Sequence, residues 1–154
     1  MNSINVYFDM DGVLCDFDGG VNEMCHVDIR DVTDDEMWDK IKSVDHFFYN
    51  LRPINSGVNL LKSCIGWGYN VEILTAIPKE KRHVTEAADD KIKWIHDNIS
   101  PSIKVNIVTR EEKKNFCLNN TDILIDDFKC NIDEWNAIGG HGILFKGGKW
   151  YNEI

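Results

Sequence analysis

Short apolar runs that end in polar residues place the strongest constraint on the fold of this chain. INVYF (residues 4–8) leads into two aspartates, VEILT (residues 71–75) ends in a threonine, and DILI (residues 122–125) precedes another pair of aspartates. Runs of this length and composition are typical of buried strands. IKVNIVT (residues 103–109) and GILF (residues 142–145) are two further strand candidates.

Helical patterns lie between these runs. Residues 56–67 end at Gly68, which is a plausible C-cap. A long, charged and periodic stretch runs from about Lys79 to Asn98, and residues 129–138 are followed by two glycines. Strands separated by helices predict an α/β fold, a Rossmann-like three-layer parallel sheet with helices on both faces.

Residues 17–52 interrupt this alternation, because they supply no strand and only two short helical patterns. The second begins after Thr33, where Glu36 completes a capping-box pattern. An insert directly after the first strand lies at the carboxyl end of the sheet, where folds of this class bind their ligands. We therefore predict a small helical cap at residues 17–52 over a core of residues 1–16 and 53–154.

The composition excludes several classes of protein. The 154 residues fit one compact domain, and 17 basic against 26 acidic residues, a net charge of −9, disfavour binding to a nucleic-acid polymer. No apolar run approaches the ~20 residues of a membrane helix and no secretion signal is evident, so we expect a cytoplasmic protein. The five cysteines form no CxxC pair, which argues against a zinc or dithiol site. The sequence does not decide between a monomer and a homodimer.

Asp9 and Asp11 stand two residues apart where the first predicted strand ends. In strand geometry their side chains point the same way, and two adjacent carboxylates repel each other unless a cation lies nearby. Oxygen ligands of this kind point to Mg²⁺. An EF-hand loop is excluded, because Val13 and Leu14 occupy positions that require Asn or Asp and then Gly. A non-catalytic acidic turn is the alternative for this motif alone.

Three further polar features accompany these aspartates. Thr75 ends a predicted strand, where its hydroxyl and nearby N–H groups can hold a phosphate. Lys113 and Lys114 supply a cation for a phosphate or a carboxylate, and Lys113 is favoured by its helical spacing from the next apolar residue. Asp126 and Asp127 follow a buried strand, where adjacent carboxylates are costly without a cation, so either is a candidate metal ligand.

The order of these motifs, strand-DxDG, strand-Thr, Lys, strand-DD, resembles that of the haloacid dehalogenase-like (HAD) hydrolase superfamily. The resemblance covers residues 4 to about 127. Within the superfamily, DMDGVLCDFDGG followed by a short helical insert is most similar to the 5'(3')-deoxyribonucleotidases and their small bacterial and phage relatives. The segment DILIDDFKCNIDEWNAIGGHGILF (residues 122–145) is similar to the tail of those small forms.

The resemblance implies a Mg²⁺-dependent phosphatase. Asp9 would attack phosphorus and form an aspartyl-phosphate, and Asp11 would protonate the leaving group and then activate water. Mg²⁺ would be held by the Asp9 carboxylate, the Asp11 backbone carbonyl and one acid of the later pair, with Asp127 favoured. Thr75 and Lys113 would bind the transferring phosphoryl group.

The resemblance also implies a substrate. Phe17 matches the base-contacting position of the family, in a predicted cap that is rich in aromatic residues. A deoxynucleoside monophosphate is therefore the expected substrate, with another small phosphate ester, or a non-catalytic phosphate- or metal-binding module, as alternatives. Ala76 stands where the deoxyribonucleotidases carry Ser, and the cap is smaller than in the vertebrate enzymes.

Overall fold

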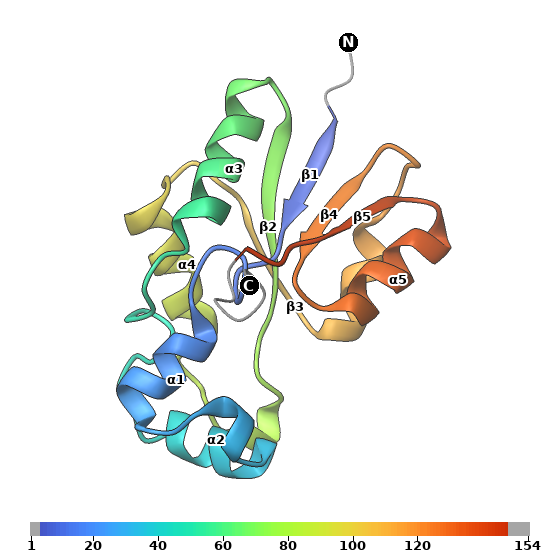
Figure 1. Ribbon diagram of the computed structural model, residues 1–154. Helices are drawn as coiled ribbons and strands as arrows, with labels where there is room; N and C mark the ends of the chain where they lie inside the picture. The colour runs from blue at the N-terminus through green and yellow to red at the C-terminus, as the bar shows by residue number, and fades with distance from the viewer. Residues whose placement is uncertain (1–3, 148–154) are drawn as a thin grey trace.

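The computed structural model describes residues 4–147. Five parallel strands form one sheet in the order β3-β2-β1-β4-β5 (Figure 1). The strands are β1 (Asn5–Phe8), β2 (Asn70–Ala76), β3 (Val105–Val108), β4 (Ile123–Asp126) and β5 (His141–Leu144). The predicted strands are all present, and their ends differ from the prediction by one or two residues.

Helices cover both faces of this sheet (Figure 1). Helices α3 (Asn55–Gly66) and α4 (Ala87–Asn98) lie on one side, and α5 (Lys129–Ile138) lies on the other with the 3₁₀-helix η3 (Arg110–Phe116) beside it. The predicted three-layer α/β fold is therefore confirmed.

Alternate side chains of the strands enter two separate cores. On β1, Val6 and Phe8 belong to the larger core, which includes Leu61 of α3 and Trp94 of α4. Tyr7, between them, belongs to the smaller core around α5. This alternation follows from the two-residue repeat of a strand. Because every strand is parallel, all the carboxyl ends meet at one edge of the sheet.

The helix predicted from about Lys79 is shorter in the structure. A 3₁₀-helix η2 (Glu80–Arg82) comes first, and α4 begins only at Ala87. His83 separates the two with a φ of 58°, in the left-handed region. That backbone conformation cannot continue a right-handed helix, so the periodic residues before Ala87 form a loop.

The segment 17–52, which we call the cap segment, contains α1 (Phe17–Cys25), η1 (Ile29–Asp31) and α2 (Asp34–Ile41). Thr33 caps α2, since its hydroxyl accepts a hydrogen bond from the Glu36 N–H at 3.2 Å. Both α-helices lie beyond the carboxyl ends of the strands (Figure 1). Among residues 4–147, no helix has both the length and the apolar character that spanning a bilayer requires.

Gly57 allows α3 to pack directly on the loop that follows β1. A Cβ atom at this position would overlap the backbone carbonyl oxygen of Val13. At Gly66, in the last turn of the same helix, a Cβ atom would meet nothing within 4 Å. The two glycines therefore separate the effect of steric overlap from the effect of helix propensity.

We predict that Gly57→Ala lowers the free energy of unfolding by about 1–3 kcal/mol, because the added methyl group forces the backbone of α3 away from the loop. The matched control, Gly66→Ala, is expected to raise it by up to about 1 kcal/mol, since alanine favours the helix. Urea unfolding of both variants measures this. A Gly57→Ala protein as stable as Gly66→Ala would contradict the close packing.

Candidate active site

The site lies at the carboxyl edge of the sheet. Asp9 directly follows β1, Thr75 lies near the end of β2, and Asp126 ends β4. Strand β1 lies between the other two, and the Asp9 N–H extends the pairing by donating to the Ile125 carbonyl at 2.9 Å. The parallel register thus brings together three polar residues that are far apart in the sequence.

The tight loop after β1 lies against Asp127, which directly follows β4. Gly12 in this loop has a φ of 80°, a conformation that favours glycine. The Asp127 carboxylate lies against Gly12 so closely that a Cβ atom there would overlap it. Gly12 therefore serves two purposes, since it turns the chain and leaves room for the acidic side chain of Asp127, which directly follows β4.

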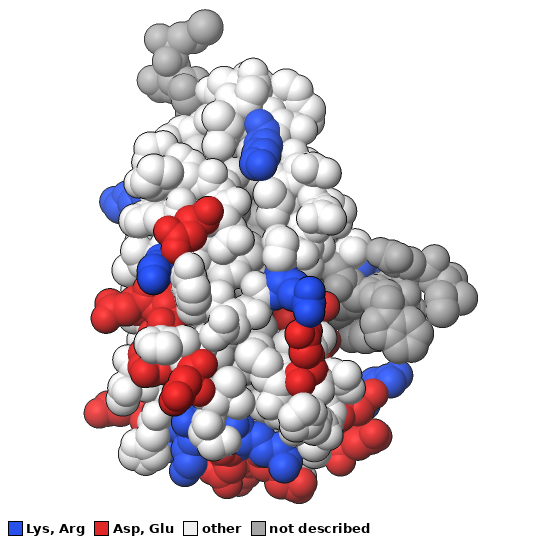
Figure 2. Space-filling model, turned by 90° about the vertical axis from the view of Figure 1, so that its left-hand side faces the viewer, with Lys and Arg blue, Asp and Glu red and all other residues white. Residues whose placement is uncertain are grey.

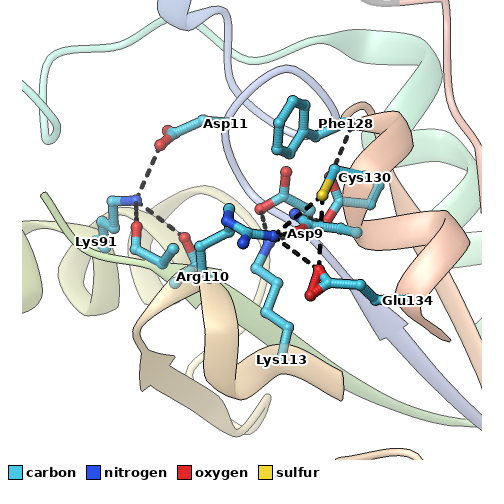
Figure 3. A network of polar contacts seen from close by, with 12 residues as sticks. Asp9, Asp11, Lys91, Arg110, Lys113, Phe128, Cys130 and Glu134 are labelled. Atoms are coloured by element: carbon cyan, nitrogen blue, oxygen red, sulfur yellow. Dashed lines mark hydrogen bonds and ion pairs between the residues drawn. The ribbon is translucent and has the colours of Figure 1, made fainter. Parts of the chain in front are cut away.

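Lys113 is the lysine that the structure brings to these acids. Its ammonium group donates to Asp9 Oδ1 and to Asp126 Oδ2, each at 2.9 Å (Figure 3), and the residue is only 3% exposed. Lys114 points elsewhere, with its ammonium 3.8 Å from Glu134 and an exposed side chain. The position of Lys113 agrees with the residue favoured from the sequence, and its role in phosphate binding stays a prediction.

Burial and neighbouring charge shift the acid–base properties of these groups. Burial raises the pKa of Asp9 to about 6, and Asp127 and Asp11 act in the same direction against the lowering effect of Lys113. Burial also raises the pKa of Asp126 to about 6, with Asp9 contributing. For Lys113, burial lowers the pKa, but the two carboxylates outweigh burial and raise it above the ordinary value. The ammonium therefore stays charged between its two partners.

Lys91 is a second buried lysine, which the sequence prediction missed. It is fully buried on α4, and its ammonium donates to Asp11 Oδ2 at 2.9 Å, to Thr75 Oγ1 at 2.9 Å and to the Ala76 carbonyl at 2.7 Å (Figure 3). One signal in the sequence was available: Lys91 falls within the apolar stripe of its helix, three residues before Trp94. A lysine at such a position needs a buried partner.

Three carboxylates converge as candidate metal ligands. One oxygen each from Asp9, Asp126 and Asp127 lies within 4.8 Å of the others. This set of hard oxygen donors fits Mg²⁺. The Asp11 carboxylate is not among them, and it accepts a hydrogen bond from Lys91. The Asp11 backbone carbonyl, which the resemblance implies as a ligand, stays a prediction.

A cavity of about 490 Å³ opens above the acids. The cap segment contributes Phe17 and Trp38 to its wall, and the loop after β4 contributes Phe128. Phe17 is also part of an aromatic cluster, with ring centroids 5.9 Å from Trp38, 5.6 Å from Phe47 and 6.1 Å from Phe48. The predicted base-contacting residue therefore lines the cavity and packs in the cap segment at once.

Acidic and basic side chains are mixed on one face of the molecule. Figure 2 shows the side of the molecule that carries α3 and α4, with acidic and basic side chains interspersed in its lower half. No continuous band of basic residues crosses this face.

The comparisons with known proteins agree with this architecture. The model of the family described as "5' nucleotidase, deoxy (Pyrimidine), cytosolic type C protein" matches residues 2–152. Comparison with curated proteins returned no match.

Solved structures of several hydrolases are similar to this chain. D,D-heptose 1,7-bisphosphate phosphatase from Burkholderia thailandensis has a TM-score of 0.56 at 12% identity, over 97% of this chain and 84% of that one. A HAD family enzyme from Bacteroides thetaiotaomicron, in complex with magnesium and inorganic phosphate, has a TM-score of 0.53 at 16% identity, over 99% and 100% of the two chains. At these identities the likeness shows the fold.

We predict that Lys113→Ala lowers kcat of phosphate release by about 100- to 1,000-fold, because it removes a preorganised charge from the reacting group. Its neighbour provides the matched control. Lys114→Ala is expected to cost less than about fivefold, since its contact with Glu134 is exposed and weak. Steady-state kinetics of the two variants measure the difference, and a large loss at Lys114 alone would reverse the assignment.

Proposed function

Because the chain belongs to the family of 5' nucleotidases, deoxy (pyrimidine), cytosolic type C, and is a phosphatase of the HAD superfamily, we propose that it hydrolyses deoxynucleoside monophosphates with the help of Mg²⁺. The observation that carries this proposal is the convergence of Asp9, Asp126 and Asp127, two of which, Asp9 and Asp126, share the buried ammonium of Lys113. Such an arrangement holds a carboxylate nucleophile in place and supplies charge for a phosphoryl group.

Asp9 is the nucleophile in this proposal. One of its oxygens attacks phosphorus, the ester bond breaks, and the alkoxide leaves with a proton from Asp11. Water then attacks phosphorus and gives a proton to Asp11. The bond between phosphorus and the Asp9 oxygen breaks, so that phosphate is released and the Asp9 carboxylate is restored. The hydrogen bond from Lys113 to Asp9 Oδ1 supports this role, because it holds one oxygen and so fixes the direction of the carboxylate.

Lys91 is a positioning residue for Asp11, the acid–base group of this reaction. Its ammonium holds Asp11 Oδ2, and so keeps the acid–base carboxylate beside the nucleophile. The same ammonium donates to Thr75 Oγ1. Because that oxygen accepts from Lys91, the hydroxyl hydrogen of Thr75 remains as a donor to a phosphoryl oxygen.

Mg²⁺ would be held by the carboxylates of Asp9 and Asp127 and by the Asp11 backbone carbonyl. When bound, it would neutralise charge on the phosphoryl oxygens. Asp127 is favoured over Asp126 because the Asp126 carboxylate already accepts three hydrogen bonds. These come from the Phe128 N–H at 2.9 Å and from the side chains of Lys113 at 2.9 Å and Asn131 at 3.0 Å.

The cap segment supports a nucleotide as substrate. Phe17 and Trp38 from the cap segment and Phe128 from the core line the cavity above Asp9 with aromatic surface. Its volume of about 490 Å³ falls in the range of small-ligand sites. A nucleobase can stack on such surfaces through its π face, whereas a sugar phosphate has no aromatic ring to stack.

We predict that the protein releases phosphate from dTMP in the presence of Mg²⁺, and that a chelator abolishes turnover until Mg²⁺ is restored. Asp9→Asn should show no turnover with its fold intact, because an amide cannot attack phosphorus. Phosphate release and circular dichroism measure both points. Full activity in the chelator, or near wild-type turnover by Asp9→Asn free of contaminating phosphatase, would contradict the proposed chemistry.

We predict that kcat/KM for dTMP and dUMP exceeds that for a sugar phosphate by about ten- to a hundredfold, since stacking is worth about 1–3 kcal/mol per base. Phe17→Ala should lower the values for the nucleotides and leave the value for the sugar phosphate, the internal control, nearly unchanged. UMP in the same panel reports the preference for deoxyribose. Equal values for all four substrates would leave a phosphatase for other small phosphate esters.

A further inference from the structure

A chain of hydrogen bonds reaches the reacting groups from outside. Arg110 Nη1 donates to Asn131 Oδ1 at 3.2 Å, and Asn131 Nδ2 donates to Asp126 Oδ2 at 3.0 Å. The same oxygen of Asp126 accepts from Lys113, which also holds Asp9. Arg110, Lys113 and Asp9 are drawn together in Figure 3. The chain therefore connects a half-exposed arginine to the nucleophile.

We propose that Asn131 and Arg110 are positioning residues of the phosphatase reaction. Arg110 orients the Asn131 amide, the amide fixes Asp126, and Asp126 holds the Lys113 ammonium against Asp9. This inference rests on the proposed function, because Asp9 is the nucleophile only in that reaction.

The chemistry of the two partners leaves the Asn131 amide one orientation. A guanidinium group only donates hydrogen bonds and an ionised carboxylate only accepts them. With Arg110 on one side and Asp126 on the other, the amide oxygen must face Arg110 and the amide nitrogen must face Asp126. A flipped amide would place its oxygen against the carboxylate. Arg110 thus prevents the orientation that would repel Asp126.

Asn131 completes the set of donors around Asp126. Both residues are buried, and a buried carboxylate keeps one orientation only while its oxygens are bonded. The Phe128 N–H binds Oδ1, whereas Lys113 and Asn131 share Oδ2. Without the amide, Lys113 is the one described side chain that donates to Oδ2, and the carboxylate has more freedom to rotate. Such a rotation moves the ammonium away from Asp9.

Arg110 also joins the two elements that carry the other members of the chain. It begins η3, which carries Lys113, and its guanidinium pairs with Glu134 at 2.8 Å on α5, the helix of Asn131. The guanidinium lies 6.0 Å from the centroid of the Phe128 ring. The contacts of the Arg110 side chain with Asn131 and Glu134 therefore join η3 to α5.

The test compares Asn131→Ala, Asn131→Asp, Arg110→Ala and the double variant Arg110→Ala/Asn131→Ala. Two controls come from α5 itself. Asn136→Ala removes an amide that binds the Gly142 backbone, and Lys129→Ala removes an exposed ion pair with Asp133. For each protein we would measure kcat and KM with dTMP and with p-nitrophenyl phosphate in Mg²⁺, and the melting temperature.

Asn131→Ala is expected to lower kcat by about ten- to a hundredfold with little change in KM, the cost of one hydrogen bond to a charged group. Asn131→Asp should be more severe, although it preserves the shape, because it turns a donor into a second negative charge. If Asn131 had a purely structural role, Asn131→Asp, which preserves the shape, would retain more activity than Asn131→Ala. Both controls should stay within about twofold, as expected for surface changes away from the site.

Arg110→Ala alone is expected to lower kcat by about three- to tenfold, and to cost clearly less in the Asn131→Ala background, where only its pair with Glu134 remains to be lost, since residues that act through one another are not additive. Additive losses, or an Asn131→Asp protein more active than Asn131→Ala, would overturn the inference, while wild-type activity on dTMP upholds the proposed function. A wild-type protein that hydrolyses neither substrate would overturn both.

Discussion

The contact on which the site depends is the ammonium of Lys113 between the carboxylates of Asp9 and Asp126. Both acids lie at the ends of adjacent parallel strands, where burial and neighbouring carboxylates raise the pKa of each and so disfavour the ionised forms. A buried carboxylate pair is tolerated when a well-placed cation compensates it, and removing that cation leaves charge without a partner. The position of η3 is therefore tied to the chemistry, because η3 delivers the cation to the edge of the sheet.

Two buried lysines divide the acidic residues between them. Lys113 from η3 serves Asp9, whereas Lys91 from α4 serves Asp11, two residues later. These lysines come from opposite faces of the sheet, α4 from the side of the larger core and η3 from the side of α5 (Figure 1). Asp9, the proposed nucleophile, directly follows strand β1 and lies between them. The site thus needs both outer layers of the fold, which is why a three-layer α/β structure suits it.

The cap segment combines packing with the wall of the cavity. Phe47 and Phe48 are buried, whereas Phe17 and Trp38 belong to the same aromatic group and also face the cavity. Few residues are available in this segment to form a core, so the same rings contribute to stability and to the surface that a ligand meets. This double use explains why composition alone could not separate a binding role for Phe17 from a packing role.

The sequence by itself determined the family, the parallel sheet and the strand ends at which the acids stand, because these depend on local apolar runs and on the order of motifs. It also determined the cap of α2, since Thr33 and Glu36 are near neighbours. The tertiary structure decided the rest. The buried ammonium of Lys91 is compensated by Asp11, a partner 80 residues away. Lys113 rather than Lys114 faces the acids because η3 docks on α5. Local patterns report the propensity of a segment, whereas the burial of a charge is decided by distant residues that compensate it.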